Sequence, residues 1–288
     1  MSGFAGLRVL ALESRRAAEF SKLISTYGGL PIVAPAMREV PLESNSEALA
    51  FAARFFAGEF DMVIFLTGVG ARTLLGVVET AYKRDDYVAA LQRIKVVARG
   101  PKPVAALREI GVTPALSVPE PNTWRELLRA LDDADQSAVG IRLNGARVAV
   151  QEYGVSNPEL LDGLEKRGAR VTRVPVYQWA LPNDLAPLRE AIQSLAEGKM
   201  DVVLFTTSVQ AVHLFQVAAA MNLEKEMRAG LGRAMVASIG PTTSEELSRQ
   251  RIRVDLEPSH PKMGSLVKEA AERAAEFIRR KPEESASA

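Results

Sequence analysis

Five short segments rich in glycine and hydroxyl-bearing residues each follow an apolar run of the sequence. They are residues 67–70, 100–102, 153–157, 206–208 and 240–243. Where such a segment opens a helix, its backbone N–H groups have no helical acceptor and the helix dipole favours negative charge. The chemistry available to these segments is therefore anion binding, and none of them contains an obvious catalytic acid. A single segment is also typical of a tight turn with an N-cap, but five favour one ligand with several negative charges.

The residues predicted to bind this anion come from these segments and from two cations. Arg15 follows the first apolar run, where a guanidinium could hold a carboxylate, and Lys102 lies inside the second segment. Either cation could instead be exposed to solvent without a ligand. The predicted set is Arg15, Thr67, Gly68, Lys102, Ser156, Asn157, Thr206, Thr207, Ser208, Gly240, Thr242 and Thr243.

Tyr177 is the candidate for proton-transfer chemistry. It lies in an extended run, Val174–Gln178, and a phenol is both a weak acid and a hydrogen-bond donor. Tyr177 could face a ligand in a cleft between domains, or it could be a buried packing aromatic. The two histidines are weaker candidates, because His213 lies in a predicted helix packed on a sheet and His260 lies in a predicted loop.

The pair Gly68 and Gly70 also invites a dinucleotide-binding interpretation, because it follows a predicted strand. The third glycine of that motif is replaced by Thr73, and no clear acidic residue ends a strand about 20 residues later. The motif GxxxxGK[ST] of phosphate-binding loops is absent as well. We therefore expect no nucleotide cofactor.

The composition excludes further classes. The chain of 288 residues has 36 Lys and Arg against 35 Asp and Glu, which is not typical of a bulk nucleic-acid-binding protein. It has no cysteine and two histidines, so we predict no disulfide, no metal site and no cofactor. No run reaches the roughly 18 apolar residues of a membrane span, and the first residues lack the features of a signal peptide. We expect a cytoplasmic protein without membrane contact.

The sequence contains a repeat. FDMVIFLT at residues 60–67 matches MDVVLFTT at residues 200–207, which places Asp61 and Asp201 140 residues apart. Two further pairs keep nearly the same spacing, namely Gly100 with Gly240 and the runs that begin at Arg8 and Arg147. The repeated apolar runs are typical of strands buried on both faces of a parallel sheet.

Amphipathic helices separate these strands. Positions 188, 191, 192, 195 and 196 are apolar at helical spacing, and so are positions 49, 52, 55 and 56. Strands that alternate with such helices predict an α/β fold. We therefore expect two similar domains, each a parallel sheet flanked by helices.

Four segments together resemble the uroporphyrinogen-III synthase family, and the likeness covers about residues 6 to 277. They are Val176–Gln178, Phe205–Ser208, Ile239–Thr243 followed by a helix, and Glu257–Val267. The resemblance implies two domains joined by a two-stranded linker, at about residues 37–42 and 173–178. It also implies an exchange of the first β–α unit, so that residues 1–38 plus 178–288 form one domain and residues 42–174 the other.

The resemblance also implies a function. The expected activity is that of a lyase of tetrapyrrole and heme biosynthesis, which cyclises hydroxymethylbilane to uroporphyrinogen III with inversion of ring D and loss of water. Tyr177 would then help the ring-D hydroxyl to leave, and the loops would bind the acetate and propionate arms between the domains. The expected partners are this small-molecule substrate and, transiently, the preceding enzyme of the pathway, with the chain itself a monomer.

Two alternatives remain at this point. One is a catalytically inactive two-lobed binding or regulatory homologue, because a fold does not fix a function. The other is a nucleotide-dependent α/β enzyme, which the missing phosphate motifs oppose. The tyrosine and the hydroxyl-bearing loops favour the synthase.

Overall fold

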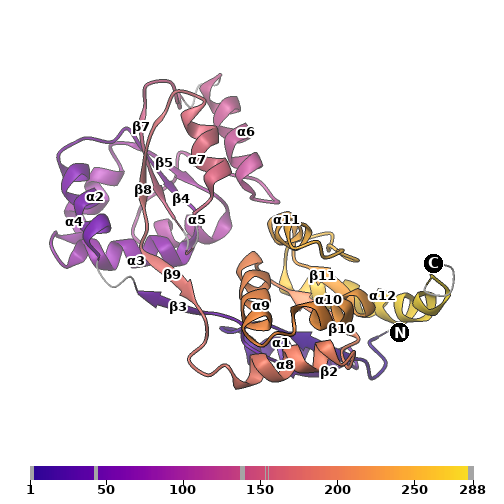
Figure 1. Ribbon diagram of the computed structural model, residues 1–288. Coiled ribbons are helices and arrows are strands. Elements are labelled where there is room, and N and C mark those ends of the chain that lie inside the picture. Colours follow the sequence, from indigo (N-terminus) through magenta and orange to yellow (C-terminus); the bar gives the residue numbers. More distant parts are fainter. Residues whose placement is uncertain (1–2, 42–44, 137–139, 153, 155, 285–288) are drawn as a thin grey trace. The chain divides into compact units, whose positions relative to one another are not determined.

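The computed structural model describes residues 3–41, 45–136, 140–152, 154 and 156–284. The chain forms two compact units, each with its own sheet and hydrophobic core (Figure 1). Unit 1 comprises Met1–Arg38 and Ala180–Ala288, and unit 2 comprises Glu39–Trp179.

Unit 1 contains a four-stranded sheet in the order β11-β10-β1-β2, and every neighbouring pair is parallel. The strands are β1 (Arg8–Ala11), β2 (Leu30–Val33), β10 (Val202–Phe205) and β11 (Met235–Ser238). All residues of β10 and β11 are buried, as expected for strands that are covered on both faces. β2 is an edge strand, and its first residue, Leu30, is exposed.

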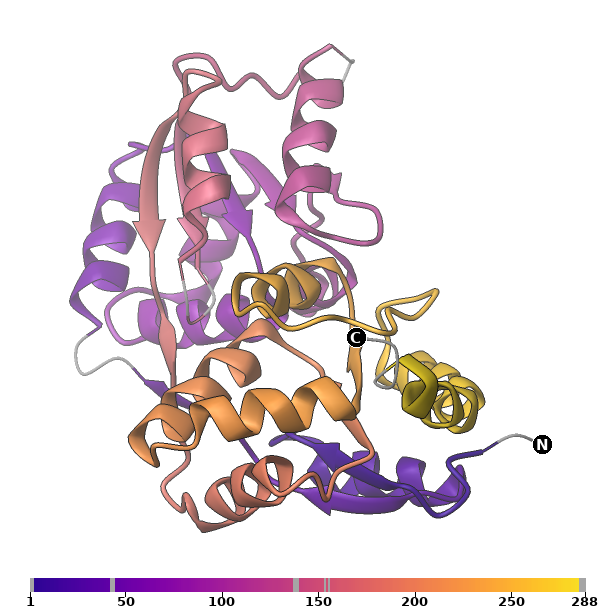
Figure 2. The same cartoon turned by 45° about the vertical axis from the view of Figure 1, so that its right-hand side comes forward.

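Helices cover both faces of this sheet (Figures 1 and 2). Leu10 packs with α8 (Ala186–Ala196), α9 (Ser208–Ala220), α10 (Glu224–Arg233) and α11 (Pro241–Arg249). Val9 and Ala11 point the other way, into a core with α1 (Ala17–Thr26) and α12 (Met263–Glu284). This alternation along β1 is the two-residue period of a strand with two buried faces.

Unit 2 contains a five-stranded parallel sheet in the order β6-β5-β4-β7-β8. The strands are β4 (Met62–Phe65), β5 (Lys95–Ala98), β6 (Leu116–Ser117), β7 (Arg147–Gln151) and β8 (Arg170–Val174). One face packs on α2 (Ser46–Phe56), α3 (Gly68–Glu79), α4 (Arg84–Leu91) and α5 (Pro101–Arg108). The other face packs on α6 (Trp124–Asp135) and α7 (Pro158–Glu165).

A separate two-stranded sheet pairs β3 (Arg38–Pro41) with β9 (Tyr177–Ala180). The predicted fold class is confirmed, because both units are α/β with parallel sheets flanked by helices. The expected linker strands were about 37–42 and 173–178, and residue 42 lies outside the described residues. The second observed strand begins later, because β8 continues through Val174 in the sheet of unit 2.

The sequence repeat is a structural repeat, marked by one ion pair in each sheet. The carboxylate of Asp201 accepts hydrogen bonds from the backbone N–H of Arg8 (2.7 Å) and from its Nε (3.1 Å). In unit 2, the carboxylate of Asp61 accepts from the N–H of Arg147 (2.8 Å) and from its Nε (3.0 Å). β1 therefore corresponds to β7, and β10 to β4.

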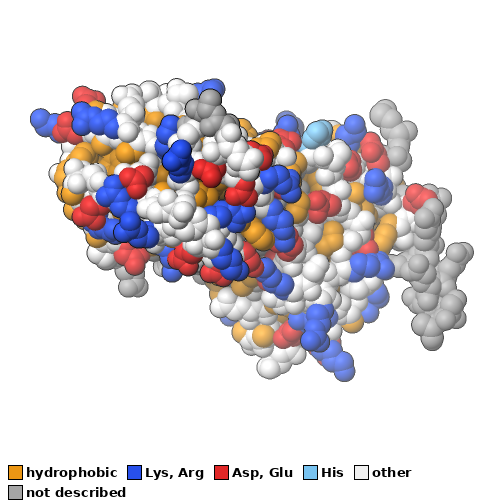
Figure 3. All heavy atoms as spheres, turned by 90° about the horizontal axis from the view of Figure 1, so that it is seen from above, with side chains coloured by type: hydrophobic (Ala, Val, Ile, Leu, Met, Phe, Trp, Pro, Cys, Tyr) orange, Lys and Arg blue, Asp and Glu red, His pale blue; other side chains and the backbone are white. Residues whose placement is uncertain are grey.

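The surface carries both signs of charge. Lys and Arg side chains alternate with Asp and Glu over the face shown in Figure 3. The net charge of the whole chain is +1. Of the helices that the structure describes, none has both the length and the apolar character that a membrane span requires.

Asp61→Asn should change how stability depends on pH. The Arg147 side chain and N–H lower the pKa of the Asp61 carboxyl to about 2. A lowered pKa stabilises the fold above the pKa of the unfolded chain, and this contribution is lost as the pH falls towards the folded value. Urea titrations should therefore show the difference in unfolding free energy between wild type and Asp61→Asn shrinking from about pH 5 downwards. A constant difference would contradict the assignment.

Asp162→Asn is the matched control. Asp162 is an exposed residue of α7, and no ion pair is found for it among the residues described. This variant should keep the pH dependence of the wild type.

Candidate functional site

The residues predicted to bind the anion lie at the carboxyl ends of parallel strands, which is the edge where ligands bind in such sheets, whereas Tyr177 begins β9 of the separate two-stranded sheet. In unit 2 they follow the neighbouring strands β5, β4 and β7, and in unit 1 they follow β11, β10 and β1. The structure therefore brings the predicted residues of each unit to one edge of its own sheet.

Thr67 joins β4 to α3 and lies beside Tyr177. Its hydroxyl oxygen accepts a hydrogen bond from the N–H of Gly70 (2.9 Å), which caps α3, and lies 3.3 Å from the Tyr177 hydroxyl. The ring of Tyr177 is buried and packs edge-on against Trp179, with centroids 5.5 Å apart. Tyr177 is thus a packing residue whose polar end reaches a strand-end loop.

A buried amide supports this loop. Gln151 ends β7, is fully buried, and accepts a hydrogen bond from the N–H of Thr67 (3.4 Å) through its Oε1. Its Nε2 donates to the carbonyl of Glu152. Gly70 leaves the space for the amide, because a Cβ there would lie 2.0 Å from Nε2 of Gln151. The second glycine of the 67–70 segment therefore has a packing role.

The helices α3 and α5 approach each other closely at Gly68 and Lys102. A Cβ at Gly68 would lie 2.6 Å from the carbonyl oxygen of Lys102, so only glycine allows this approach. The Lys102 side chain is exposed. Of residues 101–103, only Lys102 has a backbone N–H, because both neighbours are proline. This loop therefore offers fewer backbone donors than an ordinary helix start.

The loop after β7 contains a carboxylate. Glu152 is 4% exposed and accepts hydrogen bonds from the Ser156 hydroxyl (2.7 Å) and from Nε of Arg173 (3.0 Å). Hydrogen bonding to Glu152 raises the pKa of the Arg173 guanidinium. The Ser156 hydroxyl is thereby bound within the protein. Asn157 caps α7, since its Oδ1 accepts from the N–H of Leu160 (2.8 Å). Tyr153 and Val155 of the predicted segment lie outside the described residues.

Unit 1 has a carboxylate in the corresponding place. The Thr206 hydroxyl donates to Oε2 of Glu13 (2.7 Å), which links the loop after β10 to the loop after β1. A buried amide again lies behind the loop, because Oε1 of Gln210 accepts from the N–H of Thr206 (2.8 Å). Its Nε2 donates to the Thr206 hydroxyl oxygen (2.8 Å) and to the carbonyl of Leu12 (3.1 Å).

Thr207 and Ser208 open α9 with hydroxyls that remain available. Both are half-buried, and Thr207 occupies the N-cap position without a side-chain capping bond. Neither hydroxyl has a hydrogen-bond partner in the part of the chain that the structure describes. Beside them, the N–H groups of Ser208 and Val209 have no acceptor among the described residues, whereas that of Gln210 donates to the carbonyl of Thr207 (3.2 Å).

The loop after β11 is held from within. The buried Ser238 hydroxyl donates to the carbonyl of Gly240 (3.0 Å), and the same carbonyl accepts from the N–H groups of Thr243 and Ser244 (3.0 Å each). The Ser244 hydroxyl donates to Glu257 (2.6 Å). Thr243 is 3% exposed, whereas Thr242 is half-buried. Of the two threonines, Thr242 is the one that a ligand can reach.

Arg15 follows β1, His213 lies in α9 and His260 lies in a loop, as the sequence indicates. Arg15 is exposed just before α1, and its neighbour Arg16 bonds to Glu19 (Nε to Oε2, 2.6 Å). His213 is 8% exposed and its Nδ1 lies 2.7 Å from the carbonyl oxygen of Ala36. A carbonyl can only accept, so Nδ1 donates and the histidine is structural. His260 is exposed.

Four polar residues of these loops were missed by the sequence analysis: Glu13, Gln151, Glu152 and Gln210. Signals for them existed, since Gln151 and Glu152 interrupt an apolar strand at its end and Gln210 interrupts the apolar start of α9. Polar residues at positions expected to be buried normally have a hydrogen-bond partner.

Replacing Gly70 by Gln should destabilise the protein by about 1–3 kcal/mol, because the new side chain overlaps the amide of Gln151. Adding Gln151→Leu should recover most of this loss, since the double variant reproduces the pairing of Gln210 with Leu12 that unit 1 uses. Chemical denaturation of both variants measures the effect. Equal losses in the single and double variants would show that the two positions are independent.

The chemistry at the loops is limited to a few types of group. Within the described ranges they offer N–H groups, hydroxyls, amides, the Tyr177 phenol, exposed cations and the carboxylates of Glu13, Glu152 and Glu257. Among the described residues, no group of three or more His, Cys, Asp or Glu is placed to hold a metal ion. Fold and loops together define a two-unit α/β protein with polar strand-end loops in each unit.

Comparison with known proteins identifies the family. A family model described as uroporphyrinogen-III synthase HemD matches residues 18–268. The chain is 33% identical to the uncharacterized protein YjjA of Bacillus subtilis (strain 168), over 93% of this chain and 96% of that protein. It is 32% identical to a protein of Methanothermobacter thermautotrophicus (strain Delta H) that is provisionally named a uroporphyrinogen-III synthase, over 82% and 87% of the two chains. This chain belongs to the uroporphyrinogen-III synthase family.

A solved structure supports the fold. The chain is similar to the crystal structure of a mutant uroporphyrinogen III synthase from the extremely thermophilic bacterium Thermus thermophilus, with a TM-score of 0.71 and 24% identity. The match covers 94% of this chain and 99% of that chain.

Proposed function

We propose that this chain is a uroporphyrinogen-III synthase, which closes hydroxymethylbilane to uroporphyrinogen III with inversion of ring D and loss of water. Membership of the family supports the proposal. The observation that carries it is the contact of the Tyr177 hydroxyl with Thr67 at the start of α3, 3.3 Å apart. This contact puts a phenol at an edge where the protein also offers anion-binding groups.

The substrate carries eight carboxylates, so its arms need many donors. We assign them to loop groups that have no partner among the described residues: the N–H groups of Gly68 and Val69 in α3 and of Ser208 and Val209 in α9, and the hydroxyls of Thr207, Ser208 and Thr242. Arg15 and Lys102 add exposed positive charge. The Thr206 and Ser156 hydroxyls instead hold Glu13 and Glu152, so they support the loops rather than the substrate.

The same groups account for the reaction. The hydroxymethyl C–O bond breaks at one end of the chain, and ring D, at the other end, attacks the methylene carbon through the carbon that already carries its bridge to the third ring. That bridge then breaks and re-forms at the unsubstituted carbon of ring D, which loses a proton, so the ring ends inverted. The departing hydroxyl leaves as water when it receives a proton, and the neutral phenol of Tyr177 can donate one. Because the uncatalysed reaction gives the symmetric isomer, the chief task of the protein is to hold the chain in the reactive geometry.

An isomer assay tests the activity. Hydroxymethylbilane is generated in situ, the protein is added, and the type I and type III products are separated. Enrichment of type III is the expected result. Type I product alone, as in the spontaneous reaction, would show that the chain does not catalyse this cyclisation and would overturn the proposal.

Tyr177→Phe should lower kcat by about tenfold or more, because it removes the proton donor and keeps the packing against Trp179. Tyr82→Phe is the matched control, because Tyr82 stacks on Phe56 in the same unit, away from these loops. It should retain wild-type kcat. Full activity of Tyr177→Phe would remove the phenol from the mechanism.

Arg15→Ala and Lys102→Ala should each raise KM several-fold and change kcat less, because an exposed cation contributes to binding rather than to bond breaking. Lys22→Ala, which removes an exposed cation of α1, is the control and should leave KM unchanged. The measurement is the steady-state rate of type III formation against substrate concentration. A KM equal to that of wild type would exclude the cation concerned from the binding site.

A further inference from the structure

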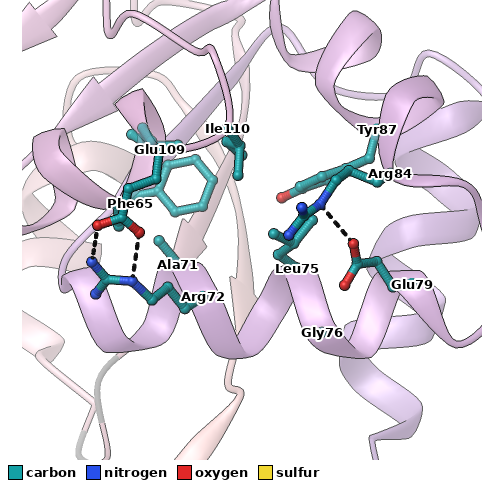
Figure 4. A pocket seen from close by; sticks show the side chains of 12 residues that line it. Phe65, Ala71, Arg72, Leu75, Gly76, Glu79, Arg84, Tyr87, Glu109 and Ile110 are labelled. Atoms are coloured by element: carbon teal, nitrogen blue, oxygen red, sulfur yellow. Dashed lines mark hydrogen bonds and ion pairs between the residues drawn. The ribbon is translucent and has the colours of Figure 1, made fainter.

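Unit 2 contains a cavity away from the strand-end loops. Its volume is about 240 Å³, and it lies between α3, the start of α4 and the end of α5 (Figure 4). The wall is mainly apolar, with Phe65, Leu75, Ala106 and Ile110 among its residues. None of the residues assigned above to the substrate lines it, so the cavity is separate from the proposed active site.

One polar atom in the wall of this apolar space has no partner. Tyr87, on α4, is 1% exposed, and its hydroxyl has no hydrogen-bond partner among the described residues. Figure 4 shows the Tyr87 side chain among those that surround the cavity. Burial raises the pKa of this phenol, so it stays protonated and can donate. Buried polar groups almost always have a partner, and a lone donor in a cavity therefore indicates a missing acceptor.

The rim of the cavity carries two ion pairs, and within each pair the positive and negative charges cancel. Arg72 and Glu109 form two parallel bonds, Nη2 to Oε1 (2.6 Å) and Nε to Oε2 (2.9 Å). Arg84 and Glu79 form the second pair, Nε to Oε1 (2.7 Å). All four side chains are exposed, so the pairs can open at little cost. With both charges of each pair satisfied, the rim favours a neutral occupant.

We propose that this cavity binds a small neutral aromatic molecule with one hydrogen-bond acceptor, which the Tyr87 hydroxyl holds. The size fits, because an apolar cavity of about 150 Å³ already admits benzene. The apolar wall would contact the ring, and the acceptor would satisfy the one unpartnered donor. Molecules of this class include aryl ketones and aryl ethers.

The cavity is lined by two helices that begin at the strand-end loops of unit 2. The occupant would touch α3 and α5, and these helices begin at the loops of Thr67 and Lys102. Binding itself does not depend on the proposed synthase activity, so each proposal can fail without the other.

The test uses 4-fluoroacetophenone and fluorobenzene as probes, with binding to the full chain followed by ¹⁹F NMR titration. Wild type should bind both saturably, and the ketone about five- to tenfold more tightly, as one added hydrogen bond gives. Tyr87→Phe should bind the two probes equally and should keep the fluorobenzene affinity. The absence of saturable binding to wild type, or an unchanged preference in Tyr87→Phe, would overturn the proposal.

A blocking variant locates the probes. Gly76 is on the rim, and a Cβ built there meets no atom within 4 Å, so Gly76→Leu adds a side chain at the mouth without a clash. Both probes should then bind at least about tenfold more weakly. Gly232→Leu is the matched control, because Gly232 is a helical glycine of unit 1 with the same open surroundings. Equal binding by Gly76→Leu and Gly232→Leu would place the probes elsewhere and refute the assignment.

Discussion

One ion pair in each sheet sets the register of two neighbouring strands. Arg8 and Arg147 start their strands by donating a backbone N–H and a guanidinium to Asp201 and Asp61, the residues that precede the neighbouring strands. Strands that start level and run parallel also end level. The loops that follow them are therefore neighbours, as the bonds from Thr206 to Glu13 and from Thr67 to Gln151 show.

The two units use different residues to accept the backbone N–H of the corresponding loop. Each places a fully buried amide behind the loop after the central strand, where it accepts a backbone N–H. In unit 1 the amide comes from the helix, as Gln210, and in unit 2 it comes from the strand, as Gln151. Gly70 stands where unit 1 has Gln210, and its missing side chain leaves the space for Gln151. The requirement for a buried acceptor is thus kept in both units, although the residue that meets it has changed.

The fold class was predictable because buried parallel strands are nearly continuous apolar runs. β4 and β10, which carry the repeat, are buried at every residue. β6 has two residues and β8 is half exposed, so neither gives such a signal. The contact of Tyr177 with Thr67 was not predictable, because it depends on where β9 lies relative to β4. The partners of Glu13 and Glu152 also come from distant segments, 193 residues away for Thr206 and 21 for Arg173.

The two carboxylates change how the loops can bind an anion. A loop with a charged Glu13 or Glu152 repels a substrate carboxylate unless a cation or a donor intervenes. Arg173 fulfils this role for Glu152, because the guanidinium pairs with the buried carboxylate. A hydroxyl that donates its hydrogen bond to a carboxylate also cannot donate it to a ligand at the same time. In the proposed function, the substrate arms would therefore bind to backbone N–H groups, to exposed cations and to hydroxyls that face no carboxylate.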